Sequence, residues 1–436
     1  STTYEGFQYF PIRGMGTVAQ VFANNGLKQY KGPSGIGHVR YSTTGSSSIE
    51  NAHPFEGVFC GELFYLAHNG NLVNTQELIK VCADRGMTHL SGIPLESLTD
   101  SALIVALISS SQKTDFQSAL SESVRLLRGT FSLVILYKES VYGVRDVSGN
   151  RPLVYAEGRG IGVLASESAL STTLNIRFIR EIAPGEIVRM VPAVYPASPQ
   201  IESVETIENG SRAFCVFEHI YFLRPDSSFV GLRAQLVREC LGKRLWEEHR
   251  GHIDADVVIS VPDSGNAAAQ GFALASGIPR RDGLMRSHTE RTFNDLYDRR
   301  EVGLQIKFGI IPEHINGKRV CVVDDSLVRA STMRKIVSVL REAGAAAIYV
   351  MISAPLYTDP CYYGIDTYRV KDELAAKRHR GDIEGIRKEI RADKLCYLSV
   401  SGLSAVMQEM TGRVGAESEY CMACFTGKYP MPISDS

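Results

Sequence analysis

The sequence predicts two domains, a layered α+β domain in its first half and an α/β domain with parallel strands in its second. In the first half, strand patterns lie on both sides of two helical patterns, which is typical of an α+β layer structure. The second half twice shows a short apolar run, then an acidic loop, then a helical pattern, the order of a βα unit. The length of 436 residues is sufficient for two separate cores.

Composition excludes several classes of function. The chain is 44% hydrophobic and 22% charged, as in ordinary globular proteins. Its formal net charge of -1 predicts no overall electrostatic attraction to nucleic acid or to a membrane. We find no apolar run of membrane-spanning length and no signal peptide. The irregular spacing of the nine cysteines does not indicate a secreted disulfide framework, so we expect a cytoplasmic, reducing location with some cysteines as metal ligands.

The first half begins with alternating apolar runs and Gly-rich turns over residues 1–70, which predict β-structure. Asn74 is suited to cap a helix that carries Leu78, Val81 and Cys82 and ends near Gly86. A second helix is predicted over residues 99–109. Apolar runs then predict strands over residues 131–137, 141–146 and 152–156.

Two segments of this half carry groups suited to catalysis. Arg40 lies in a predicted strand, followed by small hydroxyl residues, and an arginine so placed can bind a carboxylate through two hydrogen bonds. The alternative is a structural ion pair. Asn69 and Gly70 follow an apolar run, which is a hairpin signal. An asparagine amide with the next backbone N–H can also form an oxyanion hole for acyl transfer.

The second half is organised around the stretch Val320 to Ile336. Four apolar residues predict a buried strand, at whose end lie Asp324 and Asp325, and a helical pattern follows. The free N–H groups of the first helical turn, with the hydroxyls of Ser331 and Thr332, suit a phosphate. The paired acids suit ribose hydroxyls or Mg²⁺. The alternative is a surface strand end with solvated acids.

A second strand, residues 257–261, ends in Pro262–Gly265 and is followed by an Ala-rich helix. Backbone N–H groups in such a loop can meet a pyrophosphate, although an ordinary βα turn remains an alternative. Two such loops on either side of one ligand favour the phosphate hypothesis.

Together these stretches resemble the 5-phosphoribosyl-1-diphosphate (PRPP) motif of type I phosphoribosyltransferases, and more narrowly the amidophosphoribosyltransferase family. That family usually reads VDDSIVRGTT, whereas this chain has Ala330 in place of the glycine and Ser331 in place of a threonine. Glycine allows a backbone conformation that alanine disfavours. The resemblance implies an N-terminal-nucleophile hydrolase (αββα sandwich) glutaminase over residues 1–209. It also implies a phosphoribosyltransferase domain over residues 210–405 and a cluster-binding tail over residues 406–436.

The resemblance implies a glutamine site in the first half. Arg40 would hold the α-carboxylate of glutamine, and Asp100 its α-amino group. Asn69 and Gly70 would stabilise the oxyanion. The nucleophile of these glutaminases is an N-terminal cysteine whose amine acts as the base, but residue 1 is Ser. We therefore expect the nucleophile segment to be missing from this sequence.

In the second half the resemblance implies a PRPP site with Mg²⁺ bound near Ser264, Asp324 and Asp325. Arg291 matches the family's flexible lid, whose preceding residues match poorly and are one residue shorter. Lys307 matches a lysine near regulatory nucleotides, or is simply solvated. The residues implied to bind PRPP are Asp263, Ser264, Gly265, Arg291, Asp324, Asp325, Ser331 and Thr332.

The C-terminal CMAC motif alone indicates a redox pair, half of a zinc site or chance. The family closes with CxxCFTGKYP, and this chain has CMACFTGKYP. By that resemblance a [4Fe–4S] cluster is implied, with the ligands Cys215, Cys361, Cys421 and Cys424.

The reaction implied is the conversion of PRPP, glutamine and water into 5-phosphoribosylamine, glutamate and pyrophosphate, the first step of de novo purine synthesis. The family also implies a homo-oligomer, a dimer or tetramer, inhibited by purine nucleotides. Two alternatives stay open. One is an ammonia-dependent phosphoribosyltransferase with an inactive glutaminase domain. The other is a non-catalytic sensor of PRPP or nucleotides, against which the retained glutamine-site residues argue.

Overall fold

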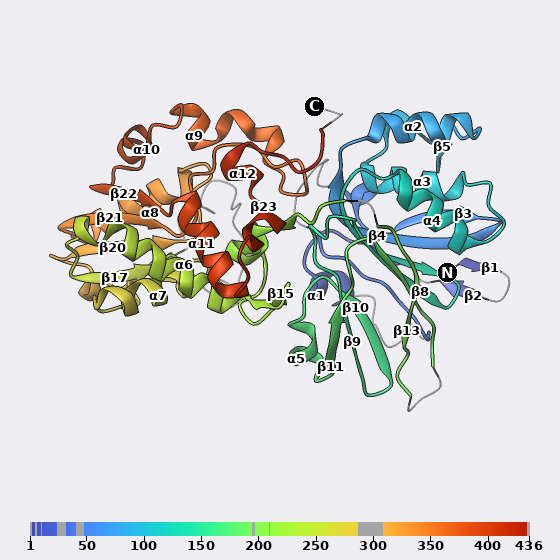
Figure 1. Cartoon of the computed structure of the whole chain (residues 1–436), viewed down its shortest axis with the longest axis horizontal. Helices are drawn as coiled ribbons and strands as arrows, with labels where there is room; N and C mark the ends of the chain where they lie inside the picture. Colours follow the sequence, from blue (N-terminus) through green and yellow to red (C-terminus); the bar gives the residue numbers. More distant parts are fainter. Residues whose placement is uncertain are drawn as a thin grey trace. The chain divides into compact units, whose positions relative to one another are not determined.

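A computed structural model describes residues 2–4, 7–9, 11–23, 32–40, 48–193, 197–208, 210–286 and 308–433. The chain divides into two compact units (Figure 1). The first unit consists of Ser1–Cys215, Cys361–Arg369 and Tyr429–Ser436, and the second of Val216–Pro360 and Val370–Lys428. The domain limits implied by the family resemblance, at residues 209 and 405, stay a prediction.

The first unit is built on an antiparallel sheet of six strands in the order β13-β12-β8-β7-β4-β3. Strand β7 is the apolar run predicted over residues 131–137, extended by two residues at its start, and β8 is the run predicted over residues 141–146, shifted by one residue toward the N-terminus. The strands are β3 (Phe55–Phe59), β4 (Glu62–Leu72), β7 (Gly129–Tyr137), β8 (Ser140–Arg145), β12 (Glu186–Met190) and β13 (Ile201–Thr206).

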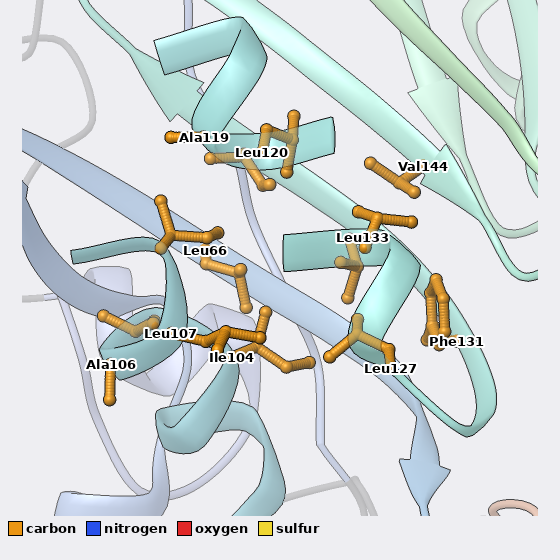
Figure 2. Packing of buried hydrophobic residues seen from close by; sticks show 14 of the residues in the cluster. Leu66, Ile104, Ala106, Leu107, Ala119, Leu120, Leu127, Phe131, Leu133 and Val144 are labelled. Atoms are coloured by element: carbon orange, nitrogen blue, oxygen red, sulfur yellow. The ribbon is translucent and has the colours of Figure 1, made fainter. Parts of the chain in front are cut away.

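A helical layer packs against this sheet, and the main core of the unit lies between them (Figure 2). Helices α2 (Thr75–Asp84) and α3 (Asp100–Ser109) confirm the two predicted helices, and α4 (Phe116–Leu126) adds a third. The hydroxyl of Thr99 caps α3 by accepting a hydrogen bond from the N–H of Ala102. Residues 101–108 of α3 are all buried, so this helix lies inside the unit rather than on its surface.

A second, three-stranded sheet has the order β10-β9-β11. It packs against the six-stranded sheet through another apolar cluster, which includes Val141, Leu153 and Val188. One helical layer and two β layers make this unit the expected layered α+β domain. Its remaining elements are β1 (Thr2–Tyr4), β2 (Phe7–Tyr9), α1 (Val18–Ala23), η2 (Ile49–Asn51), β5 (His89–Leu90), β6 (Ile93–Pro94), η3 (Leu95–Ser97), β9 (Val154–Gly158), β10 (Ile161–Ala165), α5 (Leu170–Leu174), β11 (Arg177–Glu181) and β14 (Phe214–Cys215).

The structure corrects two predictions for the first 70 residues. Val18–Ala23 forms a short helix instead of β-structure. Arg40 was predicted to lie in a strand, but residues 34–40 form no strand, because no neighbouring strand among the described residues pairs with them.

The second unit contains the predicted parallel sheet, in the order β17-β20-β21-β22. Helix α7 packs on β17 and β20, and α6 packs on α7. Helix α8 packs on β21, and α10 packs on α8. These elements are α6 (Ala234–His249), β17 (Val257–Ser260), α7 (Asn266–Ser276), β20 (Arg319–Asp324), α8 (Ser331–Glu342), β21 (Ala347–Ile352), α10 (Ile383–Ile390) and β22 (Lys394–Tyr397).

The apolar positions predicted for α8, namely Met333, Ile336, Val337 and Leu340, are all buried, which confirms its helical period. Smaller elements complete the second unit: η4, a π-helix (Glu218–Phe222), β15 (Ser228–Phe229), β16 (Leu232–Arg233), η5 (Arg250–His252), β18 (Leu284–Arg286), β19 (Phe308–Ile310), η6 (Pro312–His314), η7 (Tyr368–Glu373), α9 (Ala375–Arg378), α11 (Val400–Thr411), η8 (Ala416–Glu419), β23 (Tyr420–Cys421) and α12 (Ala423–Thr426). In the part of the chain that the structure describes, no helix is long and apolar enough to cross a bilayer.

Candidate active sites

Asn69 and Gly70 lie within β4, opposite Ser132 and Phe131 of β7. Gly70 has a φ of 150°, and a Cβ built on it would lie 1.9 Å from the carbonyl oxygen of Thr130. Only glycine can therefore bring the backbone this close to β7. The two residues form part of a continuous strand here, not a hairpin turn, and the pairing with β7 holds their backbone in place.

Asp100 is the first residue of α3 and lies beside the end of β4. Its carboxylate accepts hydrogen bonds from the N–H of Leu72 at 3.3 Å and of Ser101 at 2.8 Å. His68, one residue before Asn69, places its Nδ1 atom 3.0 Å from the Ser101 hydroxyl and 3.7 Å from the Asp100 carboxylate. Burial lowers the pKa of His68, although Asp100 opposes that effect. A neutral imidazole thus supports the predicted glutamine-binding carboxylate.

Arg40 lies close enough to two histidines to affect their protonation. Burial lowers the pKa of His38 to about 4 and that of His53 to about 2, and the positive charge of Arg40 adds to both shifts. The two imidazole rings meet edge to face, with centroids 4.2 Å apart. Arg40 therefore lies near a buried pair of histidines in the first unit.

Asp324 ends β20 and Asp325 follows it directly, as the sequence predicted. The two residues are 8% and 5% exposed. Burial raises the pKa of both carboxyls, and repulsion from Asp325 raises that of Asp324 further. No side-chain cation lies within ion-pair distance of either one among the described residues. Buried carboxyls whose pKa is raised in this way are typical of sites that receive a cation or a polar substrate.

The Pro262–Gly265 loop reaches the same edge of the parallel sheet. The hydroxyl of Ser264 donates a hydrogen bond to Asp324 Oδ1 at 3.0 Å. A Cβ on Gly265 would lie 2.3 Å from the carbonyl oxygen of Val323, so glycine permits the close approach of this loop to the end of β20. The peptide bond between Pro262 and Asp263 is cis, and Asp263 forms an ion pair with Arg286 at 3.0 Å. The two predicted loops therefore meet at one site, here called the diacid site.

The loop that leads into α8 shows the consequence of the alanine noted in the sequence. Ala330 adopts a left-handed conformation, with φ of 67° and ψ of -19°, and is buried. The next two residues, Ser331 and Thr332, are exposed at the start of α8, whose first turn has no side-chain cap. Those N–H groups and hydroxyls are available to a phosphate. Arg291 and Lys307 lie outside the described residues.

Of the four predicted cluster ligands, Cys215 and Cys361 belong to the first unit and Cys421 and Cys424 to the second. The Sγ atom of Cys361 accepts a hydrogen bond from the N–H of Tyr363 at 3.3 Å. Among the described residues, no group of three or more His, Cys, Asp or Glu side chains is arranged to hold a metal ion.

Sequence reasoning missed the support that His68 gives to Asp100. The histidine stands directly before Asn69 in the sequence, but its contact with Asp100 arises only when α3 packs beside β4. No local pattern signals such a contact.

The structure combines a candidate glutamine site in an α+β unit with a candidate phosphate site in a parallel α/β unit, the combination expected of a glutamine amidotransferase joined to a type I phosphoribosyltransferase. The model of a glutamine amidotransferase domain matches residues 38–171. The amidophosphoribosyltransferase of Synechococcus elongatus is 39% identical over 440 residues, which cover 99% of this chain and 85% of that protein. The Bacillus subtilis enzyme is 38% identical, with 97% of this chain and 85% of that protein covered.

Solved structures agree with these relatives. One described as the allosteric regulatory enzyme of purine biosynthesis has a TM-score of 0.82 at 36% identity and covers 96% of this chain and 86% of that one. The glutamine PRPP amidotransferase of B. subtilis, solved with ADP and GMP, has a TM-score of 0.81 at 35% identity, with 96% and 89% covered. The chain belongs to the amidophosphoribosyltransferase family.

Proposed function

We propose that this chain converts PRPP, glutamine and water into 5-phosphoribosylamine, glutamate and pyrophosphate, the first step of purine biosynthesis. The observation that carries this proposal is the diacid site, where the Ser264 hydroxyl meets buried Asp324. It occurs in a chain whose other unit holds Asn69 and Gly70 beside Asp100.

In the second unit, Asp324 and Asp325 would bind the ribose hydroxyls or a Mg²⁺ carried by PRPP. Carboxylate and hydroxyl oxygens are ligands that Mg²⁺ prefers, and a cation would relieve the repulsion that raises the pKa of Asp324. Bound there with Ser264, Mg²⁺ would stabilise the negative charge of the leaving pyrophosphate.

The two phosphate-bearing ends of PRPP would be bound by the two loops at the edge of the parallel sheet. The backbone of residues 263–265 would receive the pyrophosphate, and Ser331 and Thr332 the 5-phosphate at the start of α8. Arg291 is assigned to the lid that closes over the substrate. Ammonia then attacks C1 of the ribose, the bond from C1 to the pyrophosphate oxygen breaks, and the nitrogen loses one proton.

In the first unit, Arg40 would bind the α-carboxylate of glutamine and Asp100 its ammonium group. The amide of Asn69 and the N–H of Gly70 would stabilise the oxyanion as the side-chain amide is cleaved. Glutamine hydrolysis yields glutamate and the ammonia used in the second unit. We assign the nucleophile to no residue of the present sequence.

We further propose a [4Fe–4S] cluster with Cys215, Cys361, Cys421 and Cys424 as ligands. Four thiolates are the usual ligand set of such clusters, and the N–H···S hydrogen bond to Cys361 is of the kind that tunes their potential. Anaerobic purification should give about four iron and four sulfide ions per chain, and Cys361→Ser should lower both. A wild-type protein without iron would contradict the cluster.

A cytoplasmic location is part of the proposal, because the nine irregularly spaced cysteines suit a reducing compartment. Feedback inhibition by purine nucleotides, which is supported by the relative solved with ADP and GMP, and assembly into a dimer or tetramer complete the proposal. Light scattering and inhibition assays with these nucleotides test both parts.

The central experiment measures phosphoribosylamine formation from PRPP and Mg²⁺, with ammonia and with glutamine in parallel. We expect activity with ammonia from the second unit alone, and with glutamine once the nucleophile is present. Activity with ammonia but never with glutamine, in the natural full-length protein, would favour an ammonia-dependent enzyme. PRPP binding without either activity would favour a non-catalytic sensor.

A further inference from the structure

The loop between β20 and α8, residues 326–330, ends in a conformation that its last residue disfavours. Ala330 is left-handed, with φ of 67°, although its Cβ clashes with the backbone in that region. Such conformations persist only where surrounding groups hold them. The two carbonyl oxygens before Ala330 show which groups do so.

Both carbonyls accept hydrogen bonds from α9. The N–H of Ala375 donates to the carbonyl oxygen of Val328 at 2.9 Å. The Nη2 atom of Arg378 donates to the carbonyl oxygen of Arg329 at 3.1 Å. Helix α9 thus fixes the backbone on the N-terminal side of Ala330. Its first residue, Ala375, holds one of the two carbonyls, and its last residue, Arg378, holds the other.

Arg378 is itself held in place from α10. Its Nη2 atom lies 2.6 Å and 2.8 Å from the two carboxylate oxygens of Glu389. His379 Nε2 lies 2.6 Å from Glu389 Oε2, which fixes that carboxylate. The Nη2 group therefore bridges a carboxylate on α10 and a carbonyl in the loop, and the planar guanidinium holds it in a fixed orientation.

We propose that Arg378, held by Glu389, is a positioning residue for the 5-phosphate loop. It keeps the Arg329 carbonyl in place so that Ala330 stays left-handed and the first turn of α8 faces the phosphate. This inference rests on the proposed function for the phosphate itself. Arg378 does not touch the substrate in this scheme, and it acts by raising the fraction of molecules whose loop is ready to bind.

Loss of Arg378 should raise the KM for PRPP and leave kcat nearly unchanged, because the loop must reorder before it binds. In the ammonia-dependent assay we expect about a tenfold higher KM for R378A, and a kcat within about twofold of wild type. R378K keeps the charge but loses the planar bridge, so its KM should be intermediate. E389Q should shift KM in the same direction by a smaller factor.

The coupling to Ala330 separates positioning from a general loss of stability. Glycine adopts a positive φ without cost, so in the A330G background the R378A change should raise KM only about threefold or less. The matched control is R413A, which breaks an ion pair with Glu419 in the same unit, 2.8 Å long and away from the loop. R413A should leave the KM for PRPP unchanged.

An unchanged KM in R378A, or an equal increase in the wild-type and A330G backgrounds, would overturn the inference. If R378A folds poorly, E389Q and R378K carry the same test in soluble protein. A wild-type enzyme without activity would contradict the proposed function. An active wild type with an unaffected R378A contradicts only the role of Arg378.

Discussion

At the scale of single residues, several ionisable side chains are buried, and their neighbours offset little of the free-energy cost of burying them. Burial raises the pKa of the Asp324 and Asp325 carboxyls. His219 is fully buried, and neither ring nitrogen has a hydrogen-bond partner among the described residues. Each of these groups should lower the stability of the ligand-free protein.

Asp324→Asn should stabilise the ligand-free protein at pH 7 and abolish most activity. An acid whose pKa is raised on folding costs stability above its unfolded pKa of about 4, and this cost vanishes at lower pH. We therefore expect D324N to gain on the order of 1 kcal/mol at pH 7 and to lose about 100-fold in ammonia-dependent activity. Urea unfolding at pH 7 and pH 4, with the exposed D372N as control, tests this, and a destabilised D324N at pH 7 would contradict it.

His219→Phe should make the protein less sensitive to acid. Burial first, and then Arg238, lower the pKa of His219 to about 3, so the unfolded chain takes up a proton near pH 6.5 that the folded chain refuses. Stability is complete above about pH 6.5 and falls as the pH drops toward 3. Between pH 7 and pH 5 wild type should lose about 2 kcal/mol more than H219F.

The phenyl ring of H219F would lie near Phe229 and Tyr420, whose ring centroids lie 5.5 Å and 5.9 Å from that of His219, so the substitution keeps an apolar ring contact. Denaturant unfolding of both proteins over this pH range is the measurement. Parallel curves for the two proteins would show that His219 titrates normally in the folded state.

At the scale of elements, the local patterns were sufficient for most of the chain. Helices α2, α3 and α8 and strands β7, β17 and β20 follow from apolar periodicity, although the side chain of Asn74 forms no cap hydrogen bond at the start of α2. The short helix α1 was missed because six residues in a Gly-rich region carry too little periodicity. The strand predicted around Arg40 was wrong because its apolar and polar alternation finds no paired neighbour among the described residues.

One element-scale feature joins distant parts of the sequence. The segment Cys361–Arg369 belongs to the first unit, where the carbonyl oxygen of Tyr363 accepts hydrogen bonds from Thr130 at 2.6 Å and Arg151 at 3.0 Å. The neighbouring Tyr362 carbonyl accepts one from the amide of Asn71 at 2.9 Å. No local pattern predicts these contacts, because 233 positions separate Thr130 from Tyr363.

Thr130→Val should loosen that segment. Valine has nearly the shape of threonine but cannot donate to the Tyr363 carbonyl, a loss of about 1 kcal/mol. Local opening should then become several-fold more frequent, and amide hydrogen exchange over residues 361–369 should quicken by about that factor. T130S keeps the hydroxyl and should exchange like wild type. Equal exchange rates in T130V and wild type would show that Arg151 alone suffices.

At the scale of the whole molecule, the candidate sites were predictable to different degrees. The diacid site could be predicted because its acids and hydroxyls stand at the ends of βα units, where the topology of a parallel sheet brings them together. The sequence also indicated the glycine-to-alanine change at residue 330, which the structure places at a positive φ. The contact from Arg378 could not be predicted, because it depends on how α9 and α10 pack.

The two units are proposed to carry out separate steps of the reaction. If glutamine is cleaved in the first unit and PRPP is consumed in the second, damage to the glutamine site should spare the reaction with free ammonia. Arg40→Gln removes the cation proposed to bind the α-carboxylate of glutamine, a charge-assisted contact worth about 2 kcal/mol or more. In the glutamine-dependent reaction, R40Q should therefore raise the KM for glutamine at least about 30-fold.

The ammonia-dependent kcat and the KM for PRPP should remain within about twofold of wild type in R40Q. R177Q, which removes an exposed arginine paired with Glu157 at 3.0 Å in the same unit, is the matched control and should change neither reaction. Asp325→Asn is the reciprocal variant, and because ammonia from either source reacts with PRPP at the diacid site, it should impair both reactions equally. A loss of ammonia-dependent activity in R40Q would mean that the first unit also shapes the PRPP site. A glutamine KM left intact in R40Q would remove Arg40 from the glutamine site, since no neutral amide can replace the charge that the substrate carboxylate requires.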